Sequence, residues 1–117
     1  MKTDIINPPR TFRIGQDAQI EISHCANIAL KPNEQVTFVT DSSREYDVVR
    51  KSWGFYATSS VNSRLKNEGF KTALVKNNKG QRYVMLVENG KMDDFHTYLE
   101  MEVNEVVEWL DEKPTTP

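Results

Sequence analysis

Cysteine, histidine and long apolar runs are scarce in this chain of 117 residues. Cys25 is the only cysteine, which excludes an internal disulfide and the cysteine-based zinc sites. No apolar run approaches the roughly 18 residues that a membrane-spanning helix requires. Residues 1–9 also lack the apolar core of a signal peptide. From these absences we expect a cytoplasmic protein that does not enter a membrane.

The motifs of common catalytic and phosphate-binding sites are also absent. The five glycines stand at scattered predicted turns, so neither Gly-x-Gly-x-x-Gly nor a Walker A loop is present. No Gly-x-Ser-x-Gly sequence of a serine hydrolase occurs. The two histidines, His24 and His96, lack a recognised ligand set, although Asp93 lies one helical turn before His96. We therefore predict no metal site and no cofactor, and we assign no catalytic residue.

His24 and Cys25 are adjacent in sequence, which raises the question of a catalytic pair. Neighbouring side chains of a strand point to opposite faces, so these two cannot share a hydrogen bond. By alternation His24 falls in the same row as the apolar residues Ile22 and Ala26. We expect a half-buried histidine, with a role in a pocket as the alternative.

Charge is distributed unevenly, although the formal net charge is only −2. Residues 44–91 contain ten Lys and Arg against four Asp and Glu, whereas the remainder contains five against thirteen. This distribution favours an anionic ligand at the middle segment. The alternative is that the charges cover the solvated faces of different elements.

Length and composition are typical of one globular domain, with 38% hydrophobic and 27% charged residues. We predict a single α+β domain over residues 10–112. Pro8 and Pro9 cannot enter the interior of a strand ladder, so residues 1–9 are expected to form a flexible N-terminus. Residues 113–117 are expected to form a frayed tail.

Hydrophobic alternation predicts strands over much of the chain, and helical periodicity predicts two helices. The first helix follows the candidate N-caps Thr58-Ser59-Ser60 and ends near Gly69, and the second covers residues 91–103. The expected strands are 11–14, 18–30, 35–40, 45–57, 70–77, 81–88 and 105–110. From residue 45 the order is β-α-β-β-α-β, which predicts a ferredoxin-like antiparallel sheet with two helices, preceded by the N-terminal strands.

The segment 45–65 is predicted as a long internal strand that runs into the first helix. Alternation along this strand assigns Val49, Trp53 and Phe55 to packing, although Trp53 could also serve as a stacking wall. Aromatic, basic and amide groups near one junction of strand and helix are the groups that a sugar or nucleotide site uses. The candidate ligand-binding residues are Tyr46, Arg50, Lys51, Trp53, Tyr56, Ser59, Asn62 and Arg64.

The segments Tyr46–Thr58, Asn62–Leu65 and Tyr83–Glu88 resemble a family of small bacterial proteins of unknown function. The resemblance extends over residues 18–112. It implies an association with gene clusters for surface polysaccharides and for nonulosonic acids, which are acidic sugars related to sialic acid. It implies no activity and no catalytic residue.

We therefore predict a small accessory protein without catalytic activity, which binds an anionic ligand such as a sugar nucleotide in surface-glycan biosynthesis. The first alternative is an isomerase or lyase that acts on an acidic sugar, with Asp47 or His24 as its base. Another alternative is a protein–protein interaction domain or a homodimer, formed through the N-terminal strands around Phe12.

RNA binding is a further alternative, because the segment 79–86 partly matches the third-strand pattern of the RNA-recognition module. Lys79, Gly80 and Val84 fit that pattern, whereas Gln81 and Leu86 stand where the module has base-stacking aromatic residues. Lys79 and Gly80 are better explained by a hairpin turn. We accordingly do not expect nucleic acid as the main partner.

Overall fold

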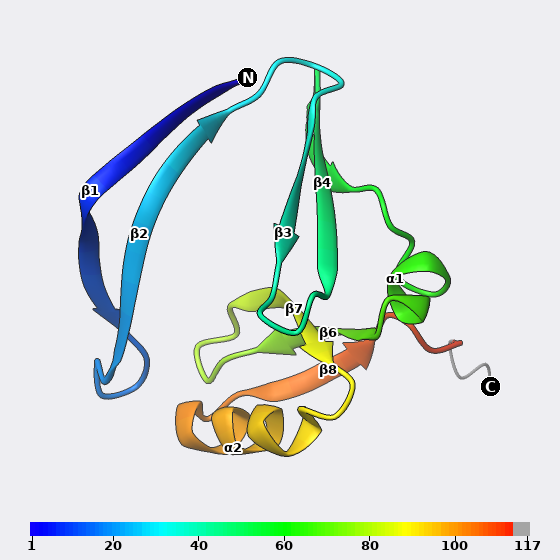
Figure 1. Ribbon diagram of the computed structural model, residues 1–117. Coiled ribbons are helices and arrows are strands. Elements are labelled where there is room, and N and C mark those ends of the chain that lie inside the picture. The colour runs from blue at the N-terminus through cyan, green and yellow to red at the C-terminus, as the bar shows by residue number, and fades with distance from the viewer. Residues whose placement is uncertain (114–117) are drawn as a thin grey trace. The chain divides into compact units, whose positions relative to one another are not determined.

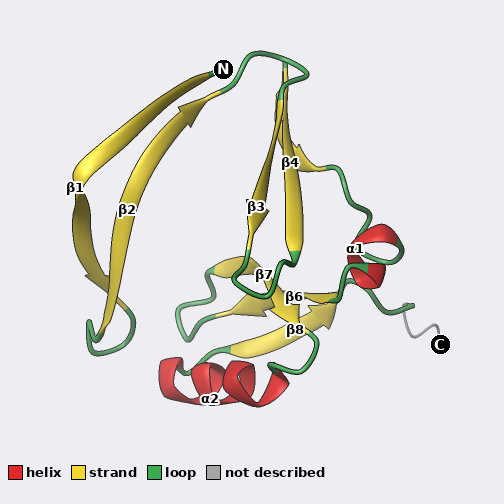
Figure 2. Ribbon diagram, viewed as in Figure 1, coloured by secondary structure: helices red, strands yellow, loops and turns green. Residues whose placement is uncertain are grey.

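The computed structural model describes residues 1–113 and contains two helices and eight strands among them (Figures 1 and 2). The elements in chain order are β1 (Lys2–Ile14), β2 (Ile20–Ala29), β3 (Gln35–Val39), β4 (Glu45–Lys51), β5 (Gly54–Ala57), α1 (Arg64–Asn67), β6 (Phe70–Lys76), β7 (Arg82–Glu88), α2 (Met92–Glu102) and β8 (Glu105–Trp109). The α+β class predicted from the sequence is confirmed. No helix within residues 1–113 is long and apolar enough to cross a membrane.

The strands form three sheets, with the orders β1-β2, β3-β4-β5 and β7-β6-β8. The predicted ferredoxin-like sheet is not confirmed by this arrangement. A ferredoxin-like sheet requires β4 to share a sheet with the three later strands, whereas β4 pairs only with β3 and β5. Both edges of β6 are already occupied, by β7 and by β8 in antiparallel register. The predicted order of elements is present, but the pairing of the strands differs.

Contacts within the chain define two compact units. Unit 1 comprises Met1–Val36 and Val48–Tyr56, and unit 2 comprises Thr37–Asp47 and Ala57–Pro117. The boundary between the units crosses both β3 and β4, so each unit contains part of these strands. The single domain over residues 10–112 stays a prediction. Of the predicted tail 113–117, residues 114–117 lie outside the described part of the chain.

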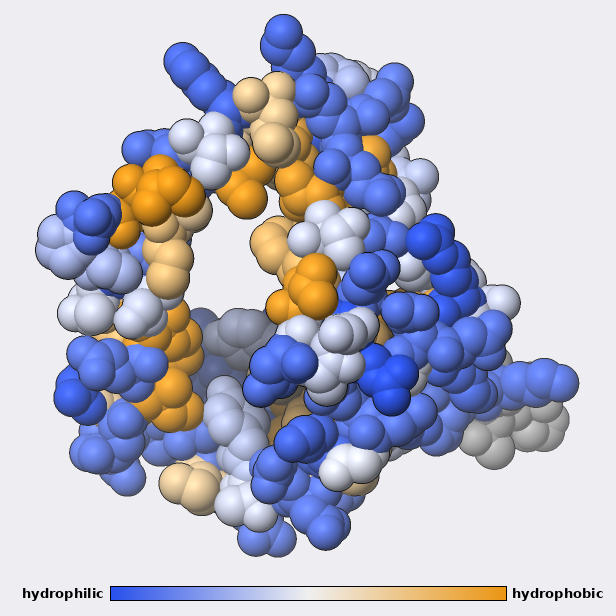
Figure 3. Space-filling model, in the orientation of Figure 1, coloured by the Kyte–Doolittle hydropathy of each residue, from blue (hydrophilic) through white to orange (hydrophobic). Residues whose placement is uncertain are grey.

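In unit 1, β1 and β2 form a long antiparallel hairpin with its turn near Gly15. The register shifts between Ile5 and Arg10, where Pro8 and Pro9 lie, because proline has no N–H to donate to the partner strand. The segment expected to be loose thus begins the first strand of this hairpin. Hydrophobic surface is visible along the hairpin in Figure 3.

The predicted continuous strand 45–57 is wrong, because a turn at Ser52-Trp53 divides it into β4 and β5. Gly54 follows this turn with a φ of 147°, a backbone conformation that residues with a side chain rarely adopt. The chain therefore reverses at this point, and a short exposed hairpin replaces the predicted internal strand.

Unit 2 contains the hydrophobic core of the described residues. Its centre is the strand β6, whose Ala73 and Val75 are fully buried and pack with Leu99 of α2. Met92, Phe95 and Leu99 follow the predicted helical stripe, and each is at least half-buried. Residues that pack against this cluster are Met85, Phe95, Val106 and Trp109. The predicted helix 91–103 and the strands on either side of it are confirmed.

The first helix is much shorter than predicted. α1 contains only four residues, and its N-cap is Ser63, which forms no side-chain capping bond. The predicted caps at Thr58-Ser59-Ser60 lie before a turn, so the prediction of a helix start there is wrong. Leu65 is the one buried residue of α1. Packing of a single side chain does not compensate for the conformational entropy that a longer helix would lose.

Candidate ligand-binding site

Two aromatic side chains stack on each other at the exposed hairpin of unit 1. The rings of Trp53 and Tyr56 have centroids 5.8 Å apart and planes 19° from parallel. Trp53 is 69% exposed and Tyr56 is 47% exposed, so the pair presents ring surface to solvent. The prediction that Trp53 and Phe55 pack in a core is wrong, since Phe55 is also 61% exposed. The turn at Ser52-Trp53 places all three rings on the surface.

Arg50 is the first cation of this hairpin, and it contacts the Phe55 ring. Its Cζ atom lies 5.7 Å from the centroid of the Phe55 ring, within the range of a cation–π contact. The Nη1 atom is buried and has no hydrogen-bond partner among the described residues. The backbone N–H of Arg50 donates to the carbonyl of Glu34 at 2.9 Å, which fixes the strand at this position. Because Nη1 is buried, this donor is not accessible to a ligand, and Arg50 as a whole is half-buried.

Lys51 is the second cation of the hairpin. Its Nζ atom donates to Oδ1 of Asn33 at 2.6 Å. An amide oxygen orients the ammonium group but does not neutralise its charge. Among the described residues of unit 1, no carboxylate forms an ion pair with Arg50 or Lys51. Arg50 and Lys51 thus carry positive charges on the same hairpin as the aromatic pair, and unit 1 leaves both charges without an ion pair.

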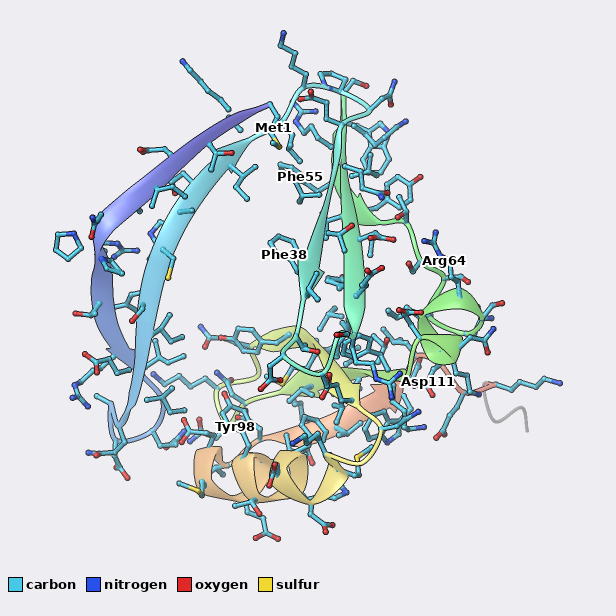
Figure 4. All side chains as sticks on the ribbon, in the orientation of Figure 1. Met1, Phe38, Phe55, Arg64, Tyr98 and Asp111 are labelled. Carbon is cyan, nitrogen blue, oxygen red and sulfur yellow. The ribbon has the colours of Figure 1, made fainter. Side chains whose placement is uncertain are left out.

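Arg64, in contrast, is engaged within unit 2. Its Nη2 atom donates to Oδ2 of Asp47 at 3.0 Å (Figure 4 shows Arg64 on α1). The other carboxylate oxygen of Asp47 accepts a hydrogen bond from Oγ1 of Thr37 at 2.5 Å. The Asp47 side chain is 8% exposed, so the pair ties α1 to the strand β4. The structure gives Arg64 a structural partner and leaves Asp47 with both oxygens occupied.

The other predicted residues of unit 2 do not form an anion site. Ser59 is buried, Tyr46 is half-buried in β4, and Asn62 is exposed. The Oγ atom of Ser60 accepts the backbone N–H of Arg64 at 3.1 Å, so this hydroxyl is occupied at the start of α1. A helix of four residues also has little dipole to offer an anion.

The eight predicted residues are divided between the two units. Unit 1 contains Arg50, Lys51, Trp53 and Tyr56, whereas Tyr46, Ser59, Asn62 and Arg64 belong to unit 2. The candidate site is therefore defined by unit 1 alone. We name it the aromatic hairpin, which consists of Arg50, Lys51, Trp53, Phe55 and Tyr56. Phe55 was missed as a site residue, although the Ser-x-Gly turn before it was a signal that the strand ends there.

The histidines do not form a metal centre with their neighbours. Within residues 1–113, no group of three or more His, Cys, Asp and Glu side chains is arranged to hold a metal ion. Nε2 of His24 lies 3.1 Å from the carbonyl of Ala26, and its Nδ1 atom is buried without a hydrogen-bond partner. Cys25 is exposed, and its Sγ atom donates to the carbonyl of Ser23 at 3.4 Å. His24 is half-buried, as expected, and points to the face opposite to Cys25.

A shallow hollow of about 460 Å³ lies in unit 2 at the C-terminal end of α2. Its lining consists of Asn77, Asn78, Leu99, Glu100, Val103, Asn104 and Glu105. Asn77 accepts two backbone N–H groups of its own turn, from Lys79 and Gln81, so this amide serves the β6–β7 hairpin. None of the eight predicted residues lines this hollow.

The aromatic hairpin is thus the one place where predicted residues meet in a group with exposed rings and uncompensated charge. The resemblance to small bacterial proteins associated with surface glycans remains a prediction. Comparison of the chain with protein-family models, with characterised proteins and with solved structures finds no match.

Proposed function

We propose that this is a binding protein without catalytic activity, whose aromatic hairpin contacts a ligand that has both a ring and a negative charge. The observation that supports the proposal is the exposed stack of Trp53 and Tyr56 on the same hairpin as Arg50 and Lys51, with Arg50 against the Phe55 ring. Exposed tryptophan in a folded chain is unusual, and an aromatic face with nearby cations suits a sugar or nucleobase attached to phosphate or carboxylate.

The ligand class follows from the two parts of the site. The apolar face of a sugar ring or the face of a base covers the outer side of an aromatic ring, and such stacking contributes about 1–3 kcal/mol per base. The guanidinium of Arg50 and the ammonium of Lys51 supply charge-assisted hydrogen bonds to phosphate or carboxylate oxygens. A sugar nucleotide or an acidic sugar satisfies both parts. A role in surface-glycan biosynthesis, as the resemblance implies, fits such a ligand.

The alternative of an isomerase or lyase receives less support from the arrangement of its proposed bases. Asp47 accepts hydrogen bonds at both oxygens and is paired with Arg64. His24 belongs to the β1–β2 hairpin and contacts the carbonyl of Ala26. Neither side chain is a member of the aromatic hairpin, where the exposed rings lie. Asp47 or His24 would therefore have to act as a base away from the exposed rings of the aromatic hairpin.

The experiment is isothermal titration calorimetry of the full chain with uridine diphosphate glucose, with glucuronic acid and with uridine. The proposal predicts binding of a charged, ring-bearing probe and weaker binding of the uncharged uridine. Trp53→Ala and Lys51→Gln should each weaken the binding by about tenfold or more. Trp53 is 69% exposed, so Trp53→Ala should change the free energy of unfolding by no more than about 0.5 kcal/mol.

Two matched variants distinguish binding at this site from nonspecific binding to other exposed side chains. Tyr83→Ala removes another exposed ring, which is 46% exposed on β7, and Lys79→Gln removes another exposed lysine. Both should leave the affinity unchanged. Equal losses in Tyr83→Ala and Trp53→Ala would contradict the assignment. RNA binding would instead appear as affinity for an oligonucleotide that falls steeply with salt.

A further inference from the structure

The β1–β2 hairpin has one apolar face and one polar face. Residues that pair directly across an antiparallel ladder point to the same side of the sheet. Ile14 pairs with Ile20 and Phe12 pairs with Ile22, and after the shift at the prolines Ile5 pairs with Ala26. The opposite side contains polar pairs such as Arg13 with Glu21. We name the apolar side the ribbon face, which consists of Ile5, Phe12, Ile14, Ile20, Ile22, Ala26 and Ile28.

The ribbon face is not covered within unit 1. Phe12 and Ile14 are each 37% exposed, and Ile28 is 39% exposed. Val49 is the only buried hydrophobic residue among the described residues of this unit. Figure 3 shows hydrophobic surface along the hairpin. A sheet of two strands is at best marginally stable in water, so a face of this kind requires a covering surface.

Two nitrogen-bearing side chains lie in the middle of the ribbon face. Arg10 pairs across the ladder with His24, and the Cζ atom of Arg10 lies 4.9 Å from the centroid of the Phe12 ring. No carboxylate of unit 1 forms an ion pair with Arg10 in the described structure, and Nδ1 of His24 is buried without a hydrogen-bond partner. An arginine in the centre of an apolar surface requires an acidic partner when that surface is covered.

The chain itself contains a segment with the matching chemistry. Residues 92–112 contain eight Asp and Glu and no Lys or Arg. Three of these carboxylates, those of Glu105, Asp111 and Glu112, already pair with Lys71 or Lys76 of β6. Three apolar side chains of this segment are exposed, namely Met101, Val103 and Val107. We name residues 92–112 the acidic segment. It combines carboxylates with apolar surface, which is the complement of an apolar face with a cation at its centre.

We propose that the ribbon face is covered by the acidic segment of a second copy of this chain. Carboxylates of that segment then pair with Arg10, and its exposed apolar side chains pack on the isoleucines and Phe12. Because every copy has both surfaces, a two-fold dimer contains the contact twice and closes without free surfaces of this kind. The dimer forms independently of ligand binding at the aromatic hairpin.

The test is sedimentation velocity of the full chain over a wide range of concentration, with a matched pair of variants on one strand. Ile22→Asp places a charge on the ribbon face, whereas Ser23→Asp places the same charge on the polar face one residue away. The dimer dissociation constant should rise about tenfold or more in Ile22→Asp and stay unchanged in Ser23→Asp. A monomer at every concentration, or a dimer that Ile22→Asp leaves intact, overturns the proposal.

A second pair of variants tests the identity of the covering surface. Arg10→Glu should weaken the dimer to a similar extent by repelling the acidic segment, and Lys2→Glu on the polar face, opposite Ala29, should not. Amide hydrogen exchange, measured above and below the dimer dissociation constant, should show protection on dimerisation in both residues 2–29 and residues 92–112. Protection of the hairpin without the acidic segment shows that hairpin packs on hairpin and overturns the assignment. The exchange pattern of β6 reports whether unit 2 of each variant is folded.

Discussion

Lys71 on the central strand β6 forms an ion pair with Asp111, with 3.0 Å between Nζ and Oδ2. The Asp111 side chain is fully buried, and its Oδ1 atom accepts the backbone N–H of Thr72 at 3.0 Å (Figure 4). The two bonds hold the segment that follows β8 against the beginning of the central strand β6. Burial alone would raise the pKa of Asp111, but the hydrogen bonds from Lys71 and Thr72 outweigh it and lower that pKa below its usual value. The hydrogen bond to Asp111 raises the pKa of Lys71.

We expect Asp111→Asn to lower the free energy of unfolding by about 1–3 kcal/mol, because a buried charge-assisted hydrogen bond is lost. Chemical denaturation followed by far-UV circular dichroism measures this change. Glu112→Gln is the matched control, since Glu112 also pairs with Lys71, at 3.2 Å, but its side chain is 56% exposed. The control should cost no more than about 0.5 kcal/mol. Equal effects of the two substitutions would show that burial of Asp111 contributes nothing.

The same pair predicts how stability depends on pH. The pKa of Asp111 is lower in the folded chain than its ordinary value of 3.8. Asp111 therefore stabilises the fold fully at a pH above 3.8, and this contribution is lost as the pH falls through the lowered pKa. The pKa of Lys71 is higher in the folded chain than its ordinary value of 10.5. Lys71 therefore stabilises the fold fully at a pH below 10.5, and this contribution is lost as the pH rises through the raised pKa. Unfolding free energies measured from acid to alkaline pH should therefore fall at both ends.

In Asp111→Asn, the acid loss of stability should be smaller than in the parent chain, because the titrating carboxyl is gone. The alkaline loss should shrink too, since Lys71 no longer has its buried partner. A pH profile of the variant that runs parallel to that of the parent chain would contradict both assignments.

Gly69 and Gly80 provide a matched test of a close contact. Both have positive φ, 101° and 79°, so alanine is strained at either position. A Cβ atom at Gly69 would lie 2.9 Å from Cζ of Arg44, whereas a Cβ at Gly80 would meet nothing within 4 Å. We expect Gly80→Ala to cost about 1 kcal/mol and Gly69→Ala to cost more, because Arg44 must also move. Thermal denaturation of both variants checks the order, and a smaller loss for Gly69→Ala would contradict it.

The C-terminal end of α2 is strained at Val103, which has a φ of 56° and a ψ of 46° in the left-handed region. A β-branched residue is unfavourable there, and glycine is the usual residue at this position of a helix. Val103→Gly should therefore raise the free energy of unfolding by about 1 kcal/mol. Met101→Gly, two residues earlier and inside the helix, should lower it by about 1 kcal/mol. Effects of the same sign at both positions would contradict this account of the helix end.

The elements from Phe70 to Trp109 agree with their sequence-based predictions to within a few residues. Each is one uninterrupted apolar pattern, and Asn and Gly mark the turns between them. Such local signals predict where an element begins and ends. They do not predict which strands pair, because β6 accepts β7 on one edge and β8 on the other through contacts between distant residues. The expected ferredoxin-like sheet failed at this step.

The candidate site shows the same division between local and distant information. Residue type predicts Trp53 and Tyr56 as site residues, yet alternation predicts a core position for Trp53 because it does not reveal the turn before Gly54. Arg64 was identified by its charge, yet the pairing with Asp47, seventeen residues earlier, is invisible in the local pattern. A strand rich in aromatic residues and an exposed aromatic hairpin have the same composition. Only the position of the turn distinguishes them.

A charged, ring-bearing ligand should stack on the Trp53–Tyr56 pair. The chain contains only two tryptophans, and Trp109 packs edge-on against Phe95 in unit 2 with ring centroids 5.9 Å apart. The two indole N–H signals in an amide correlation spectrum therefore report the site and an internal control. On titration with uridine diphosphate glucose, the indole signal of Trp53 should shift and saturate while that of Trp109 stays in place. A Trp53 signal that does not move, or equal shifts of both signals, would contradict the account.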